Sequence, residues 1–238
     1  MEQIYTIPLN EVFDAVTAEG APCDCPLCLL QGKLEENELD LILGASMMEP
    51  DIRIKTNARG FCRDHYKKML GMKNRLGLSL MLESHLAEVK KRLSPSPLSV
   101  IAGKRAEHFT KEIAKMECSC YICDKMTYHM DRSMINLAAM YASDEAFRRK
   151  VNETPYFCLP HARALCEASK RELSGKALIA FCDTVMQAVM RYLEDLSADI
   201  SFFCKKFDYR YADEPWGNAK DAPIRAAAFL TGDPKGKT

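Results

Sequence analysis

The feature that most constrains this chain is a pattern of cysteine and histidine residues that occurs twice. Each copy begins with three cysteines in the spacing C-x-C-x2-C and ends with a C-x2-H pair. The first copy comprises Cys23, Cys25, Cys28, Cys62 and His65, and the second comprises Cys118, Cys120, Cys123, Cys158 and His161. The leading cysteines are offset by 95 positions (23 to 118) and the closing pair by 96 (62 to 158), so one inserted residue separates the copies. The sequence therefore predicts a duplicated architecture organised around two equivalent sites.

These residues have the types and the spacing of a structural zinc site. Zinc takes four sulfur or nitrogen ligands in a tetrahedron, often as two short pairs that the fold brings together. A C-x2-H pair at the start of a helix places both side chains on one face, where the helix dipole favours a thiolate. We predict two Cys3His zinc sites per chain, one in each repeat: Cys25, Cys28, Cys62 and His65 in the first, and Cys120, Cys123, Cys158 and His161 in the second. Four protein ligands leave no open position for a substrate, which is typical of structural zinc.

The third leading cysteine of each copy, Cys23 or Cys118, keeps an alternative open. It gives each site five potential ligands, which an iron–sulfur cluster could use. The favoured interpretation is that Cys23 and Cys118 are thiols close to the metal but outside its four ligands. Buried thiols that recur only because of a duplication would not explain the histidine in both copies.

Apolar residues recur at helical spacing along most of the chain, which predicts an all-α fold. After the first C-x2-H pair they form one stripe with steps of three or four: Leu78, Leu82, Leu86, Val89 and Leu93. The second copy repeats the last four positions of this stripe 96 positions later and extends the pattern to Phe207, which predicts a long central helix. Residues 1–9 are predicted to be extended. The acidic residues of the helix that begins near Leu29, among them Glu35, are predicted to face solvent.

The chain contains one segment that resembles a linker, the Ser-Pro-Ser-Pro sequence at 94–97. Paired prolines cannot continue a helix. We therefore predict a single domain over 1–238 that consists of two pseudo-symmetric repeats, 1–94 and 98–207, and a C-terminal tail, 208–238. Because each repeat has a long apolar helical face, the two are expected to pack together into one core.

The repeated motifs also carry a resemblance. The sequence C-P-L-C, then Glu49 and Arg53, then G-F-C-x2-H, with a closing segment at 206–210, resembles a family of bacterial proteins of similar length to which no activity is assigned. The resemblance spans the whole chain and implies no catalytic role. The ligand spacing is also similar to treble-clef zinc sites, although the helices inserted between the two pairs depart from the hairpin of that pattern.

The composition of the chain argues against a nucleic-acid partner and against a membrane span. The 33 basic and 33 acidic residues cancel, so the chain lacks the basic surplus that binding to nucleic acid normally requires. No apolar run approaches the roughly 18 residues that would indicate a membrane span, and the N-terminus does not resemble a secretory signal. The sequence predicts a cytoplasmic protein whose cysteines are reduced and bind metal.

The sequence contains no phosphate-binding glycine loop, nucleophile elbow or H-E-x-x-H helix, so nothing in it supports catalysis. We predict a zinc-stabilised helical protein that acts as a scaffold or binds a protein partner. The alternative is a thiol-redox or metal-responsive sensor, and a nucleic-acid-binding zinc protein is a third, less favoured interpretation.

Overall fold

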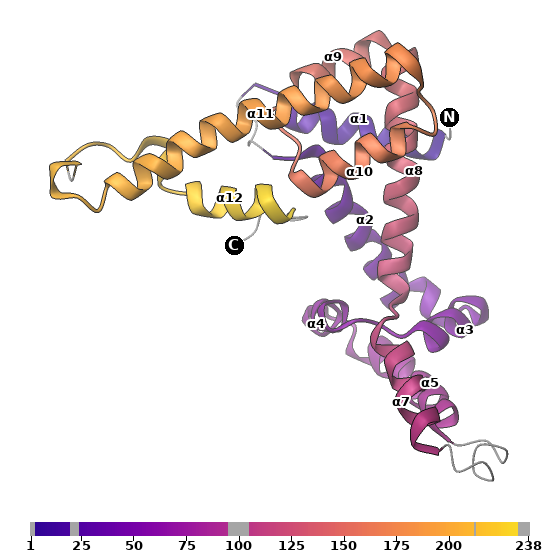
Figure 1. The fold of residues 1–238 in the computed structure, drawn as a ribbon. Helices are drawn as coiled ribbons and strands as arrows, with labels where there is room; N and C mark the ends of the chain where they lie inside the picture. The colour runs from indigo at the N-terminus through magenta and orange to yellow at the C-terminus, as the bar shows by residue number, and fades with distance from the viewer. Residues whose placement is uncertain (1–2, 20–23, 95–104, 212, 233–238) are drawn as a thin grey trace. The chain divides into compact units, whose positions relative to one another are not determined.

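The structure, a computed structural model, describes residues 3–19, 24–94, 105–211 and 213–232. All regular elements in these ranges are helices, so the predicted all-α fold class is confirmed (Figure 1). None of these helices combines the length and the apolar character that crossing a bilayer requires. Cys23 and the prolines of the predicted linker lie outside the described residues.

The helices are long enough to carry the chain over large distances, which matters for the position of the cysteines. The α-helices are α1 (Gln3–Thr17), α2 (Pro26–Leu43), α3 (Pro50–Arg59), α4 (Arg63–Gly71), α5 (Arg75–Leu93), α7 (Arg105–Glu117), α8 (Tyr121–Ser143), α9 (Glu145–Glu153), α10 (Leu159–Ser169), α11 (Gly175–Lys205) and α12 (Ala222–Thr231). Short 3-10 helices lie at Ala45–Met48 (η1), Tyr209–Tyr211 (η2) and Gly217–Ala219 (η3).

The chain divides into two compact units. Unit 1 comprises Met1–Lys33 and His129–Thr238, and unit 2 comprises Leu34–Tyr128. The boundaries fall inside α2 and α8, so α2 begins in unit 1 and ends in unit 2, whereas α8 begins in unit 2 and ends in unit 1. The units therefore do not coincide with the sequence repeats, whose boundary is the segment at 94–97. The superposition of the two repeats and their union in a single domain stay predictions.

Unit 1 has an aromatic core around α11, the long helix that the apolar stripe predicts. Tyr192 of α11 stacks on Tyr156 with 3.9 Å between the ring centroids, and Phe229 of α12 packs beside it at 5.4 Å. Phe13 of α1 meets the edge of Phe147 of α9 at 5.1 Å. Aromatic pairs of this kind add to the free energy gained by burying the rings. In this way α11 and the aromatic pairs hold together segments from both ends of the chain.

The first helix differs from the prediction. Residues 3–9 are not extended, because α1 begins at Gln3 and contains Pro8. A proline inside a helix costs about 3 kcal/mol. Tyr5, Leu9 and Val12 are all buried along this helix, and each such burial contributes roughly 1.5–3 kcal/mol. The apolar face of α1 therefore outweighs the local effect of its proline.

Unit 2 is arranged so that the loop before Cys62 lies against the start of α8. Gly60 ends α3 at φ 59°, and its carbonyl accepts a hydrogen bond from the backbone N–H of Tyr121 at 2.9 Å. The hydroxyl of Ser119 donates to the carbonyl of Arg59 at 2.6 Å. These two bonds attach the first C-x2-H pair to the second C-x2-C pair. The core below them consists of residues from α2, α4, α5 and α8: Leu39, Ile42, Leu43, Met69, Leu78, Met81, Tyr121, Ile122 and Met126.

Candidate metal centres

The eight predicted ligands form two clusters, one in each unit. Centre 1 lies in unit 1 and consists of Cys25, Cys28, Cys158 and His161. Centre 2 lies in unit 2 and consists of Cys62, His65, Cys120 and Cys123. In each centre the four ligand atoms lie within 4.8 Å of one another. Both sets are Cys3His, as the sequence predicts.

The predicted assignment of ligands to sites is wrong in one respect, because each centre combines pairs from both repeats. The C-x2-C pair of the first repeat meets the C-x2-H pair of the second in centre 1, and the reverse holds in centre 2. The cause is the helix that follows each C-x2-C pair. At 1.5 Å per residue, the 18 residues of α2 span about 27 Å and the 23 residues of α8 about 35 Å. Each helix carries the chain into the other unit before the closing pair of the same repeat occurs.

The spacing of the atoms in centre 1 matches a tetrahedral site. The Sγ of Cys28 lies 3.6 Å from the Sγ of Cys158 and 3.4 Å from Nδ1 of His161. The Sγ of Cys158 and the Sγ of Cys25 lie 3.2 and 3.9 Å from the same Nδ1. Four ligands around one zinc ion are separated by about 3.8 Å between two sulfurs and roughly 3.5 Å between sulfur and nitrogen, given the usual metal–ligand bond lengths.

Centre 2 has the same geometry. The three sulfurs of Cys62, Cys120 and Cys123 lie 3.1, 3.3 and 3.5 Å from Nδ1 of His65. The sulfurs of Cys62 and Cys123 are 3.9 Å apart. The backbone N–H of Cys123 also points at the sulfur of Cys120 at 3.5 Å, as is usual in a C-x2-C turn that binds metal. Both centres therefore fit a single ion held by four protein atoms.

Helix starts position all the ligands. Cys62 and Cys158 are the N-cap residues of α4 and α10, and the two histidines lie in the first turns that follow. The prediction that each C-x2-H pair opens a helix is thereby confirmed. Cys25 immediately precedes α2, and its carbonyl accepts the N–H of Cys28 at 3.0 Å. In every pair the first turn of a helix places two side chains on the same side, so that two helix starts complete each site.

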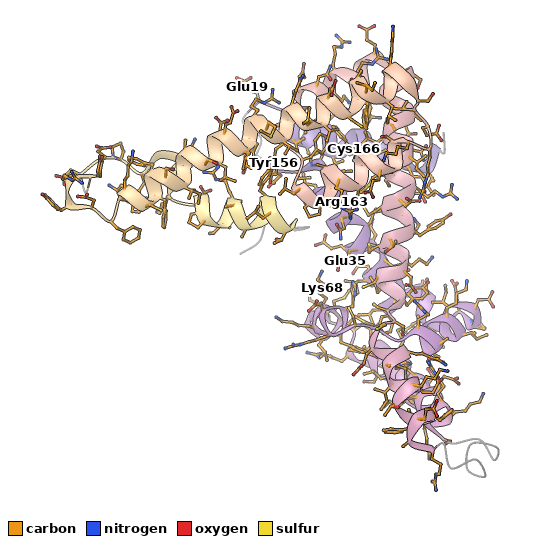
Figure 2. All side chains as sticks on the ribbon, viewed as in Figure 1. Glu19, Glu35, Lys68, Tyr156, Arg163 and Cys166 are labelled. Atoms are coloured by element: carbon orange, nitrogen blue, oxygen red, sulfur yellow. The ribbon has the colours of Figure 1, made fainter. Side chains whose placement is uncertain are left out.

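Each histidine is held from behind by a residue of α2. With Nδ1 directed at the sulfurs, Nε2 of His161 lies 3.1 Å from Oε1 of Gln31, and Nε2 of His65 lies 2.9 Å from Oε1 of Glu35. Glu35 also accepts a hydrogen bond from Lys68, and Figure 2 shows these two side chains next to one another. Histidines that bind metal commonly donate their second N–H in this way, which fixes the ring and increases its basicity.

The carboxylate of Glu35 and the ring of His65 strongly affect each other. Burial lowers the pKa of His65, but the thiol of Cys120 and the carboxylate of Glu35 outweigh burial and raise this pKa to about 10. The hydrogen bond from His65 holds the pKa of Glu35 at about 2, against the opposing effect of burial and with further help from Lys68. Glu35 is thus a buried anion at neutral pH, placed directly behind a predicted ligand.

Each centre contains one thiol that ionises readily. Hydrogen bonds from Cys25 and Cys28 lower the pKa of Cys158 to about 4, and the pKa of Cys28 is correspondingly raised. In centre 2 burial opposes ionisation of Cys120, yet the hydrogen bond with His65 and those from the backbone bring its pKa to about 6. A thiolate is the form in which cysteine binds a metal ion. Each centre therefore contains a thiol whose lowered pKa favours the binding of a cation.

The two centres differ in their exposure to solvent. In centre 1 the three cysteines are between 0 and 5% exposed and His161 is 9% exposed. In centre 2, His65 and Cys120 are buried, but Cys62 is only partly buried and Cys123 is exposed. The sequence, which repeats the same ligand pattern, gives no indication of this difference.

The two residues behind the histidines are not among the residues that the sequence predicts to belong to the sites. Glu35 is predicted to face solvent, and this prediction is wrong, because the residue is 6% exposed and faces His65. Gln31 belongs to no motif in the sequence. A search for polar residues one and two turns after a C-x2-C pair would have found both, since they lie three and seven positions after Cys28. Cys118 is exposed and is not one of the four ligands of centre 2.

Comparison with known proteins adds a family but no activity. A family model described as a family of unknown function (DUF6062) matches residues 1–237. No curated protein and no solved structure matches the chain. The resemblance to a family without an assigned activity is confirmed at this level.

Proposed function

This chain belongs to DUF6062, a family of unknown function, and we propose that it is a zinc-stabilised helical scaffold that binds a protein partner and has no catalytic activity of its own. The observation that carries the proposal is the pair of Cys3His clusters. Each brings together ligands that are far apart in the sequence, 130 positions between Cys28 and Cys158 and 61 between Cys62 and Cys123. A metal ion in each centre would join distant segments of its own unit.

Two features support a single zinc ion in each centre over an iron–sulfur cluster. Ligand atoms that lie between 3.1 and 3.9 Å apart can share one ion, as can be seen in centre 2. A cluster places several iron and sulfide atoms between its ligands and therefore needs more widely separated sulfurs. In addition, the set of three cysteines and one histidine is common in structural zinc sites.

The ligand sets also support a structural role. Four protein ligands complete a zinc tetrahedron, so neither centre offers the open position that a catalytic zinc keeps for water. The free energy of binding metal in such a site is also free energy of folding. Under this proposal the ions hold the helical units in shape, and the partner is a protein, because the balanced charge disfavours nucleic acid. A cytoplasmic location, where thiols stay reduced, is part of the same proposal.

Metal analysis of the purified chain tests this function. Elemental analysis is expected to find two zinc ions per chain, and the protein should be colourless. Chelation should then reduce the helical circular dichroism signal strongly, with recovery when zinc is restored. Brown protein that contains iron and labile sulfide would contradict the zinc assignment. Full helicity without any metal would contradict the structural role.

A further inference from the structure

The difference in exposure between the centres indicates that they have different roles. Centre 1 is enclosed, since Cys28 is 5% exposed and Cys158 is fully buried. In centre 2, Cys123 is an exposed residue and Cys62 is only partly buried. A buried thiolate in a metal site is shielded from oxidants, whereas an exposed one can react. Identical ligand types should therefore have unequal reactivity.

From this difference we propose that centre 2 is a redox site at which a peroxide joins Cys62 and Cys123 in a disulfide and releases the metal, while centre 1 keeps its ion. The inference rests on the proposed function, since it needs a metal ion in both centres. It gives one centre a regulatory role and leaves the other a purely structural one.

The geometry selects this pair of thiols. Cys62 and Cys123 are the two cysteines of centre 2 that are not buried, and their sulfurs lie 3.9 Å apart, against the roughly 2.05 Å of a disulfide bond. Cys62 is the N-cap residue of α4 and Cys123 lies in the first turn of α8, so a movement of two helix ends brings the sulfurs together. In centre 1, Cys28 and Cys158 are as close, at 3.6 Å. The two centres therefore differ in the exposure of their cysteines to solvent and not in the distance between their sulfurs.

The reaction balances with a peroxide as the only oxidant. A bound ion would keep Cys123 in its thiolate form; this thiolate attacks one peroxide oxygen, the O–O bond breaks, and a sulfenic acid and hydroxide form. The sulfur of Cys62 then attacks the sulfenic sulfur, the S–S bond forms, and the second hydroxide leaves. Two protons convert both hydroxides to water, so that two thiolates lose two electrons and the peroxide gains them. No oxidation of a bound ion would be needed; only Cys120 and His65 would remain to hold it, which is too few ligands for stable binding.

The surroundings of His65 favour reversal of this reaction. Glu35 of α2 contacts the histidine ring and itself accepts a hydrogen bond from Lys68 of α4, and neither contact involves the two oxidised sulfurs. Cys120 is buried, and its sulfur accepts a hydrogen bond from the backbone N–H of Cys123. Two of the four ligands, His65 and Cys120, are thus held in place by contacts that do not require the metal. A thiol reductant should restore the other two, and zinc should bind again.

Peroxide treatment of the zinc-loaded full-length protein tests the inference. A chromogenic chelator measures released zinc, and mass spectrometry of peptides identifies the oxidised cysteines without any substitution. We expect release of one of the two ions, in step with a Cys62–Cys123 disulfide, and rebinding after reduction. Release of both ions together, release from centre 1, or a disulfide other than Cys62–Cys123 would overturn the inference. A chain that never contains metal would instead remove the proposed function, and this inference with it.

Cys118→Ser provides the matched control. Cys118 is an exposed thiol close in sequence to Cys120, but it is not one of the ligands. The variant should bind two ions and release one at the rate of the wild type. If the substitution abolished release, Cys118 would be the residue that attacks the peroxide, and the assignment of that role to Cys123 would be wrong.

Discussion

At the residue scale, the contacts behind the histidines distinguish the two centres as clearly as exposure does. His65 is backed by a buried carboxylate and His161 by an amide. An anion on Nε2 makes the ring a better donor to a cation on Nδ1 and compensates part of the charge of the ion. Since Glu35 has no equivalent behind His161, its contribution should be confined to centre 2.

This argument predicts the effect of Glu35→Gln. The substitution keeps the shape and the acceptor but removes the charge, so the zinc affinity of centre 2 should fall by about 10- to 100-fold, as is typical for residues behind a metal ligand. Competition with a chelator of known affinity measures the loss for each centre. Asp40→Asn, which removes an exposed charge from the same helix, is the control and should change neither affinity. Equal weakening of both centres by Glu35→Gln would contradict the argument.

At the element scale, the helix starts were the easiest part of the site to predict. A C-x2-H pair at the N-terminus of a helix follows from local geometry, and both α4 and α10 begin there. The apolar stripe likewise indicated α11, because an uninterrupted period near 3.6 is a local property of the sequence. The helical state of residues 3–9 was not predictable in this way, since the burial of Leu9 against the rest of unit 1 decides it.

The backbone of Gly60 positions the loop that carries Cys62 into centre 2. Its φ of 59° and ψ of −159° lie in a region that is essentially restricted to glycine, and an added Cβ would lie 2.8 Å from Nε2 of His85. Gly60→Ala should therefore destabilise the protein by about 1–3 kcal/mol and weaken zinc binding at centre 2. Denaturant unfolding and zinc titration measure the two effects.

Gly71→Ala is the matched control for this prediction. Gly71 lies at the end of α4, and a Cβ there would meet nothing within 4 Å. Alanine also restricts the unfolded chain more than glycine does, so this variant should be as stable as the wild type or slightly more stable. A Gly60→Ala protein that is as stable as Gly71→Ala would show that the loop before Cys62 can adopt another conformation.

At the scale of the whole molecule, the eight ligands could be predicted from the sequence but their pairing could not. The offset between the copies concerns only the order of residues along the chain. It suggests that each repeat forms a site from its own four ligands. The lengths of α2 and α8 and the hydrogen bond from Tyr121 to Gly60 decide the pairing instead. These are properties of the folded chain, and no local sequence pattern predicts which unit a helix enters.

The crossed pairing makes the two halves of the sequence depend on each other. Each centre takes two ligands from residues 1–94 and two from the second repeat. A protease site inserted at 95–97 should therefore yield two fragments that elute together in gel filtration while zinc is present. Chelation should weaken their association. Fragments that separate with their zinc still bound would show that each half closes its own site.

Zinc counts in two double variants test the crossed pairing most directly. Cys28→Ser with Cys158→Ser removes two ligands from centre 1 alone, so the chain should retain one tightly bound zinc ion. Cys28→Ser with Cys62→Ser removes one ligand from each centre, and a chelator should then extract both ions. The two proteins lose the same number of thiols and differ only in where the losses fall. The reverse outcome, one ion retained in the second variant and none in the first, would contradict the structure and support sites formed within each repeat.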